Sequence, residues 1–327
     1  MKRFKNILCV VEPGGVCKPM LMRAVSLAKN NQARLTVIDV VERVTAGIRM
    51  PEGGPISANL QAVIVKDHMQ KLELVLDQYT KQIEIKFNVL VGTPFLEIIR
   101  EVLRNGHDLV IKVPEDQDWF DRLFGSDDMH LLRKCPCPVW LIKPQAPNTH
   151  RRILASVDID DTYPTLEQDS RHTLNRQIIE MASSLALSDF AELHITHVWD
   201  ALGESTIRNS AFMRWPDEEV AAYIEQVRQY HTTNLDRLIH EVTSNLGQDA
   251  MDYLKPQTHL VKGWARKEVP LLAKQIEADL VVMGTIARTG VSGFFMGNTA
   301  EAILNQIDCS VLAIKPPGFV TPVTLDE

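Results

Sequence analysis

The stretch ADLVVMGTIARTGVSGFFMGNTAEAILNQ, residues 278–306, decides how the rest of the chain is interpreted. It opens with a continuous apolar run, typical of a buried strand in a parallel sheet, and it closes with a helical pattern. The segment between them combines glycines with side chains that donate hydrogen bonds: Gly284, Gly290, Gly293, Gly297, Thr285, Arg288, Thr289, Asn298 and Thr299. Backbone freedom, N–H donors and a cation are what a bound phosphate requires. A glycine-rich surface turn is the alternative.

Length and composition indicate a two-domain protein that does not bind nucleic acid directly. The chain has 327 residues, and domains usually span about 100 to 200. Its formal net charge of −7 argues against binding nucleic acid through bulk electrostatics. No apolar run reaches the roughly 18 to 20 residues of a membrane span, and the start MKRFKNILCVV leads directly into a predicted strand. We therefore expect a cytoplasmic protein without a membrane partner.

The cysteines do not have the spacing of a disulfide framework, so reduced thiols are expected. They are Cys9, Cys17, Cys135, Cys137 and Cys309. Cys135 and Cys137 read C-P-C and are followed by Val139 and Trp140, which resemble the start of a strand. A metal or redox role for this pair is the alternative to a structural one.

The second half of the chain repeats the first. RRILASVDID from Arg151 matches KNILCVVEP, and AELHITHVWD from Ala191 matches ARLTVIDVV, with Val198 over Val40. ADLVVMG matches HDLVIKV with Asp279 over Asp108, and SVLAIKPPG matches PVWLIKPQ. Strands alternate with helices in both halves, which predicts parallel α/β sheets. We expect a tandem duplication with domains at residues 1–147 and 148–327.

The first copy of the glycine-rich loop is degenerate. Val113 stands where Gly284 stands in the second copy, and Gly125-Ser126 is what survives of the motif. The middle glycines are absent, and four carboxylates appear in this loop: Glu115, Asp116, Asp118 and Asp121. Each would repel a nearby phosphate by about 1 kcal/mol or more where it is partly desolvated. The C-terminal half is therefore expected to hold the phosphate site, and the N-terminal half has lost it or binds something else.

This loop resembles the phosphate signature of the universal stress proteins, which reads G-x-x-G, nine residues, then G followed by Ser or Thr. Gly284 and Gly297 match the first and last glycines. Ala287 stands at the second glycine, where its methyl group opposes close backbone approach to a phosphate, and Asn298 stands at the Ser/Thr position. The segments HDLVIK, LLRKCPCPVW and GNTAE resemble the tandem-domain branch of that family, so the resemblance covers both halves.

The resemblance implies a fold and a ligand. It implies two tandem domains, each a five-stranded parallel sheet of order 3-2-1-4-5 flanked by helices. Pairing through the last strands, PVWLIK and SVLAIK, would pack them as an intrachain pseudo-dimer, and a homodimer of the whole chain stays open. It also implies ATP, with Mg²⁺, at the carboxyl ends of the C-terminal strands, and a role in surviving starvation, oxidative or DNA-damaging stress.

The same resemblance implies site residues in the C-terminal half. Asp158 would lie near the ribose and phosphates, and Val198 would offer backbone groups to adenine. The phosphate contacts would come from Gly284, Thr285, Arg288, Gly297, Asn298 and Thr299. Asn298 is also a good N-cap, and Asn298-x-x-Glu301 reads as a capping box, so a cap alone and a cap that also binds phosphate both stay open.

No catalytic group is evident. His194 and His197 are three residues apart on a predicted strand, so they face opposite sides and cannot both bind one metal. Asp158, Asp160 and Asp161 could hold Mg²⁺ against a triphosphate, or they could form a solvated loop. We therefore assign no catalytic or metal-binding residue.

Several apolar residues suggest a second ligand hypothesis. Trp199, Phe212, Met213, Trp215 and Trp264 could line a pocket or belong to the core, and Phe294, Phe295 and Met296 are unusually apolar for a phosphate loop. A nucleotide-like headgroup with an apolar tail would suit such residues. Three functions are therefore compared: a nucleotide-binding stress protein, a module for another phosphorylated or lipid-like metabolite, and a slow nucleotide hydrolase with at most weak ATPase activity.

Overall fold

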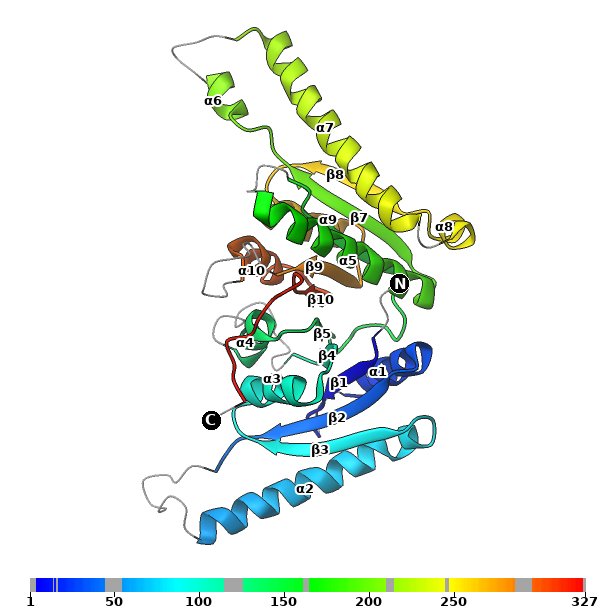
Figure 1. Cartoon of the computed structure of the whole chain (residues 1–327), viewed down its shortest axis with the longest axis vertical. Helices are drawn as coiled ribbons and strands as arrows, with labels where there is room; N and C mark the ends of the chain where they lie inside the picture. The colour runs from blue at the N-terminus through cyan, green and yellow to red at the C-terminus, as the bar shows by residue number, and fades with distance from the viewer. Residues whose placement is uncertain are drawn as a thin grey trace. The chain divides into compact units, whose positions relative to one another are not determined.

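The computed structural model describes residues 4–13, 15, 17–44, 55–114, 126–160, 165–209, 215–244, 247–285 and 296–325. Strands and helices alternate along both halves of the chain (Figure 1), as the sequence predicts. The described residues form two compact units. The N-terminal unit contains residues 4–148, 296 and 309–325, and the C-terminal unit contains residues 149–285 and 297–308.

The N-terminal unit has a parallel sheet in the order β3-β2-β1-β4-β5, which is the predicted 3-2-1-4-5. Its strands are β1 (Asn6–Val10), β2 (Arg34–Val41), β3 (Ile85–Val91), β4 (Leu109–Lys112) and β5 (Val139–Leu141). Its helices are α1 (Lys18–Asn31), α2 (Pro55–Thr80), α3 (Pro94–Asn105) and α4 (Asp127–Lys134). The strands β1 and β4 are fully buried, which explains why their sequences are continuous apolar runs rather than alternating ones.

The C-terminal unit repeats this arrangement, with parallel strands in the order β8-β7-β6-β9. Its strands are β6 (Arg152–Val157), β7 (Glu192–Trp199), β8 (Gln257–Lys262) and β9 (Leu280–Gly284). Its helices are α5 (Thr165–Asp189), α6 (Glu204–Asn209), α7 (Asp217–Thr243), α8 (Gln248–Leu254), α9 (Ala265–Gln275) and α10 (Asn298–Leu304). Helix α5 packs on β6, β7 and β9, and α9 packs on β7 (Figure 1).

The last strand of the chain, β10 (Ser310–Ile314), belongs to the N-terminal unit by its contacts. It pairs antiparallel with β5, with Val311 opposite Leu141 and Ala313 opposite Val139. The hydroxyl of Ser310 accepts a hydrogen bond of 3.1 Å from the backbone N–H of Lys143 beside this pairing. The segments PVWLIK and SVLAIK therefore pair within the chain, while the pseudo-dimer of whole domains stays a prediction.

Equivalent residues of the two repeats have the same structural role. The carboxylate of Asp108 accepts backbone N–H groups of Lys5 and Asn6, at 2.6 and 3.0 Å. The carboxylate of Asp279 accepts those of Arg151 and Arg152, at 2.6 and 3.1 Å. Each aspartate thus ties the fourth strand of its repeat to the start of the first, which confirms the predicted alignment of these two positions.

The repeats differ most in the helix after the first strand. Helix α1 has 14 residues and α5 has 25. The two helices end at equivalent positions, because Gln32 and Phe190 both adopt positive φ directly after the helix and precede the second strand. The additional turns of α5 therefore extend its N-terminus, toward the carboxyl ends of the strands.

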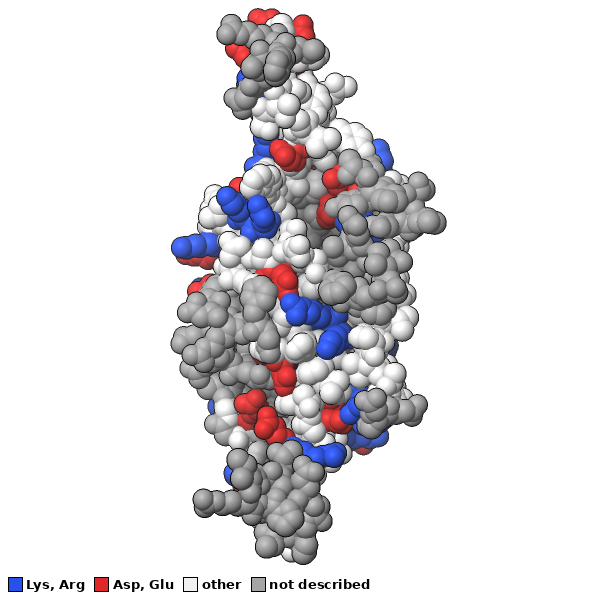
Figure 2. Space-filling view, turned by 90° about the vertical axis from the view of Figure 1, so that its left-hand side faces the viewer, with Lys and Arg blue, Asp and Glu red and all other residues white. Residues whose placement is uncertain are grey.

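On the face drawn in Figure 2, basic and acidic side chains of the described residues are interspersed, without a large area of one sign. None of the helices in the described part of the chain combines the length and apolarity needed to cross a bilayer.

Candidate functional site

A cleft of about 1140 Å³ opens at the carboxyl ends of the C-terminal strands. The ends of β6, β7 and β9 supply its floor, through Val157, Val198 and Gly284 among others. Parts of α5, α7, α9 and α10 also line it. This is the edge at which ligands bind in open parallel α/β sheets. The cleft lies where the sequence predicts the phosphate site.

The residue that follows β6, Asp158, is held by helix α5. Its backbone N–H donates to Asn175 Oδ1 at 3.0 Å, and its carbonyl accepts from Asn175 Nδ2 at 2.6 Å. Its carboxylate receives a hydrogen bond of 2.8 Å from Arg171 Nη1. Counted back from the equivalent helix ends at Gln32 and Phe190, Arg176 is the counterpart of Lys18, the first residue of α1. Arg171 and Asn175 precede Arg176, so they have no counterpart in α1. The N-terminal extension of α5 therefore supplies the groups that fix Asp158 in the cleft.

A tight turn at Gly263 brings an aromatic ring and a cation to the cleft. Gly263 has φ +144° and a Cβ there would lie 2.8 Å from Glu268 Cγ, so no other residue fits without strain. Its N–H donates to the carbonyl of Trp199 at 2.8 Å, which ties the turn to the end of β7. Trp264 is the N-cap residue of α9, and the Arg266 guanidinium lies over its indole at 4.8 Å. Trp264 and Arg266 both line the cleft.

The two ends of the predicted phosphate loop meet. The N–H of Gly297 donates to the carbonyl of Thr285 at 3.1 Å, which joins the end of β9 to the start of α10. Thr285 is fully buried, whereas Gly284 and Gly297 line the cleft. A Cβ on Gly284 would lie 2.8 Å from Leu174 Cδ2, so this glycine also lets α5 pack closely against β9.

The expected capping box at Asn298 is wrong. Gly297 is the N-cap of α10, and Asn298 is the first helical residue. The N–H of Glu301 donates to the carbonyl of Gly297, at 3.0 Å. Because Asn298 already has helical geometry, its side chain is one position too late to bridge to Glu301 as a cap. Asn298 and Thr299 are both exposed, and Thr299 lines the cleft.

Two histidines form one wall of the cleft. His197 on β7 and His231 on α7 are buried and lie 3.1 Å apart, Nε2 to Nδ1. The His231 ring also lies 5.8 Å from that of Trp199, centroid to centroid. Burial lowers the pKa of His197, and the nearby carboxylate of Asp158 offsets part of this effect. The His197 ring is therefore neutral at neutral pH and can share a hydrogen bond with His231.

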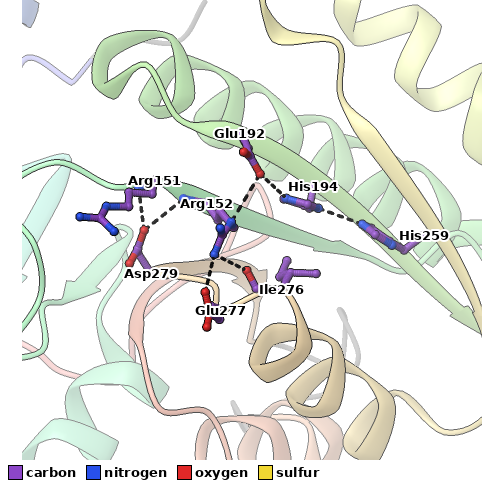
Figure 3. Close-up of polar contacts among 8 residues, drawn as sticks. All are labelled: Arg151, Arg152, Glu192, His194, His259, Ile276, Glu277 and Asp279. Carbon is purple, nitrogen blue, oxygen red and sulfur yellow. Dashed lines mark hydrogen bonds and ion pairs between the residues drawn. The ribbon is translucent and has the colours of Figure 1, made fainter.

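The other strand histidine, His194, takes part in a separate network (Figure 3). Its Nδ1 lies 2.9 Å from His259 Nε2 on β8, and its Nε2 lies 3.6 Å from the carboxylate of Glu192. Arg152 bonds to Glu192 and Glu277 beside them. Burial lowers the pKa of both His194 and His259. The two strand histidines thus have different partners, as their expected placement on opposite faces of the strand requires.

The structure brings together most, but not all, of the predicted site residues it describes. Those that line the cleft are Asp158, Val198, Gly284, Gly297 and Thr299. Thr285 and Asn298 are not among the lining residues, so their role as phosphate ligands stays a prediction.

The other candidates divide between the cleft, other surroundings and the undescribed segments. Of the aromatic candidates, Trp199 and Trp264 line the cleft, together with Tyr223 and Tyr230. Trp215 is exposed. The following candidates lie outside the described residues: Ala287, Arg288, Thr289, Gly290, Gly293, Asp161, Phe212, Met213, Phe294, Phe295 and the acidic loop of the first repeat, residues 115–125.

Two cations of the cleft were missed from the sequence, Arg171 and Arg266. Arg171 lies in the part of α5 that has no counterpart in α1, so the length difference between the repeats was the available signal. Arg266 lies three residues after Gly263, and Phe95 lies three residues after Gly92, the equivalent glycine of the first repeat. A comparison of charge at equivalent positions would have found Arg266.

The N-terminal repeat fills the equivalent positions with a buried ion pair. Lys112 ends β4, and its ammonium donates to Asp128 Oδ1 on α4 at 2.7 Å. Strand register makes Met283 the counterpart of Lys112, because each pairs with the matching position of its first strand. Met283 and Ala300, the counterpart of Asp128, line the C-terminal cleft. The ion pair therefore occupies positions that border open space in the other repeat.

The family model of the universal stress proteins matches residues 3–143 and again residues 169–315. The chain belongs to the universal stress protein family. Universal stress protein E of Escherichia coli strain K12 is 30% identical over 334 aligned residues, which cover 100% of this chain and 99% of that protein. The universal stress protein E homolog of Haemophilus influenzae is 29% identical and covers 96% of this chain and 98% of its own length. The similarity to these relatives extends over both repeats.

Solved structures of similar chains support the same fold. A functionally unknown protein from Pseudomonas aeruginosa PAO1 is 26% identical, with a TM-score of 0.64, over 96% of this chain and 93% of its own. A universal stress protein from Archaeoglobus fulgidus shares the fold at 16% identity, with a TM-score of 0.62 over 95% of this chain and 98% of its own. Two tandem α/β domains of the universal stress protein type thus make up the chain.

Proposed function

We propose that this universal stress protein binds ATP or a related nucleotide in the cleft of its C-terminal half. The observation that carries the proposal is the convergence of Asp158, Val198, Gly284, Gly297 and Thr299, predicted from the sequence, on one cleft at the carboxyl ends of the strands. Arg171 and Arg266 add two guanidinium groups to this cleft. Guanidinium groups bind phosphate oxygens in bidentate geometry, so they suit the phosphates of a nucleotide. The nucleotide would be bound together with Mg²⁺.

The protein would act in the cytoplasm as a nucleotide-responsive component of resistance to starvation, oxidative or DNA-damaging stress. Binding is its function in this proposal, and hydrolysis is at most incidental. The carboxylate of Asp158 accepts a hydrogen bond from the Arg171 guanidinium, and its backbone is fixed by the Asn175 amide. These contacts fix the position of the Asp158 carboxylate in the cleft, as a ligand-binding group requires.

The size of the cleft favours a second candidate ligand. At about 1140 Å³ it exceeds the roughly 300 to 1000 Å³ of typical small-molecule pockets. The part of its lining that comes from β7, α7 and the residue before α9 forms an aromatic wall of four side chains: Trp199, Tyr223, Tyr230 and Trp264. Aromatic rings of this kind bury apolar or planar groups. A phosphorylated metabolite with an apolar portion would use the same cations and this wall at once.

Isothermal titration with ATP and Mg²⁺ tests the first candidate. We expect one binding event per chain, lost in Gly297→Leu, because the side chain would project from the cleft lining. Ser126→Leu changes the equivalent of Asn298 in the first repeat and should leave binding unchanged. Absence of heat at millimolar ATP would exclude the ATP proposal. An equal loss in both variants would show that binding does not reside in the C-terminal cleft.

A second arm separates the two ligands. Trp264→Ala should weaken binding of a phosphorylated ligand with an apolar tail by about 10-fold or more, since a buried aromatic contact contributes on the order of 1 to 3 kcal/mol. Arg266→Ala should weaken the binding of both ligands, ATP included, because it removes a phosphate-binding cation. If Trp264→Ala leaves an acylated nucleotide unaffected, the aromatic wall has no part in ligand binding.

A further inference from the structure

Away from the cleft, the N-terminal unit holds two buried thiols beside a buried ammonium group. Cys135 is the C-cap of α4, and Cys137 precedes β5. Their Sγ atoms lie 3.6 Å apart, and both side chains are buried. Lys315, directly after β10, is buried too, and its ammonium donates a hydrogen bond to the carbonyl of Leu132 in α4. The end of α4, the turn at Pro136 and the end of β10 thus bring these groups together.

The charges of this cluster are complementary. Burial of an ammonium group is unfavourable unless an anion compensates it. Burial lowers the pKa of the Lys315 ammonium group, and negative charge on Cys135 or Cys137 offsets part of this effect. A thiolate is a soft ligand, and two thiolates with one ammonium leave a net charge of −1.

We propose that Cys135 and Cys137 form a binding site for one soft monovalent cation, of the Cu(I) class, with Lys315 as its counter-charge. Soft thiolate ligands select Cu(I), which accepts two such ligands, whereas structural Zn²⁺ sites use four. The cation binds both sulfur atoms, and the two thiols each release one proton to solvent. Two thiolates, one monovalent cation and one ammonium then sum to zero, which is the charge that a buried site favours.

The separation of the sulfurs suits this ligand. A metal–thiolate bond is about 2.3 Å long, so two bonds reach across at most roughly 4.6 Å. The observed 3.6 Å therefore requires the two Sγ atoms to open by no more than about 1 Å. Pro136 between them is half-buried.

The second repeat provides an internal comparison. With Lys315 aligned on Lys143, Ile307 stands where Cys135 stands, and Cys309 stands where Cys137 stands. The C-terminal repeat therefore has one thiol at these two positions. Its lysine, Lys143, is only half-buried. For both reasons the proposal assigns the site to the N-terminal unit alone.

The test is an anaerobic competition of the full-length, fully reduced protein with bicinchoninate for Cu(I). We expect one equivalent withdrawn from the chelator by the wild type. Cys135→Ser and Cys137→Ser should each abolish this equivalent, whereas Cys309→Ser should keep it. Lys315→Met should lower the affinity by about 10- to 100-fold, the usual effect of losing a group that supports metal ligands. Lys143→Met is its matched control and should have no effect.

If Lys315→Met does not fold, two further experiments still test the proposal. Adding Ile307→Cys to the Cys135→Ser variant gives the second repeat two thiols at the equivalent positions, and it should bind Cu(I) more weakly than the wild type. A parallel competition with a Zn²⁺ chelator should show no transfer. Equal Cu(I) binding by the wild type and Cys135→Ser, or transfer of Zn²⁺ in preference to Cu(I), would overturn the proposal.

Discussion

The two repeats place different side chains at equivalent positions around the carboxyl ends of their strands. The N-terminal repeat has the ion pair of Lys112 and Asp128, both buried, where the C-terminal repeat has Met283 and Ala300 at the cleft. The N-terminal helix α4 is capped by the hydroxyl of Ser126, which accepts a hydrogen bond of 3.3 Å, whereas α10 begins after a glycine. The same fold therefore supports a filled and an open version of one site.

A second equivalent pair differs in charge rather than in packing. Asp39 on β2 lies 2.5 Å from His68 Nδ1 on α2, and His197 on β7 lies 3.1 Å from His231 on α7. His197 is the counterpart of Asp39, because each directly precedes the aligned valines of the two second strands. The N-terminal pair joins a carboxylate to an imidazole, and the C-terminal pair joins two imidazoles. Divergence after duplication has thus altered the polar residues around the site while the strands kept their register.

The largest predicted effect comes from breaking the N-terminal ion pair. Lys112→Met removes the ammonium from a buried carboxylate, which should lower the free energy of unfolding by about 3 to 5 kcal/mol. The double variant Lys112→Met with Asp128→Ala installs the residues of the C-terminal repeat and should recover most of this loss. Urea denaturation of both variants measures the difference.

The control for this prediction is Lys81→Met, because the ion pair of Lys81 and Asp77 is exposed. We expect no measurable change in its urea midpoint. If the double variant is as unstable as Lys112→Met, the two repeats do not tolerate exchange at these positions.

A smaller effect is expected at the helix cap. Ser126→Ala removes the side chain that accepts the Met129 N–H and should cost about 1 kcal/mol. Ser126→Gly removes the same hydroxyl but keeps a residue that suits an N-cap, so it should cost only a few tenths of a kcal/mol. Thermal unfolding measures both. Unchanged stability in both variants would mean that the hydroxyl bond contributes little to α4.

The smallest and most gradual effect concerns pH. Burial lowers the folded-state pKa of His197 below its unfolded value of about 6.5, so the ring is neutral in both states above that pH. As the pH falls through about 6.5, the unfolded chain takes up the proton first, and the free energy of unfolding decreases. His197→Asn should remove its share of this decrease in urea midpoints measured on either side of that pH.

The N-terminal counterpart should respond in the opposite direction. Burial raises the folded-state pKa of Asp39 above its unfolded value of about 3.9, although His68 opposes the effect. As the pH falls from the folded-state pKa toward about 3.9, the folded chain takes up the proton first, and the free energy of unfolding increases.

The control for His197→Asn is His172→Asn, at an exposed histidine, which should keep the full slope of urea midpoint against pH. If His197→Asn retains the wild-type slope, His194 and His259 account for the acid sensitivity instead.

Sequence reasoning predicted the fold well because buried parallel strands leave continuous apolar runs that a repeat makes easy to align. It also predicted Asp158, Val198 and Gly297 as site residues from their places in the pattern of strands and helices. Asp158 directly follows a strand, Val198 lies near the end of a strand, and Gly297 directly precedes a helix. It failed at Asn298, because the start of a helix shifts by one residue through backbone geometry that composition does not record. It also missed Arg171, since the extension of α5 has no copy in the first repeat.

The pairing of β10 with β5 has a consequence for biosynthesis. Leu141 and its partner Val311 are 170 residues apart, so the edge of β5 lacks this neighbour until the ribosome has synthesised Val311. An open strand edge is a surface on which other chains can pair. Non-local pairings of this kind also form slowly. Truncation after the C-terminal cleft would therefore damage the N-terminal unit first, and the last strand of the chain is what completes its earliest domain.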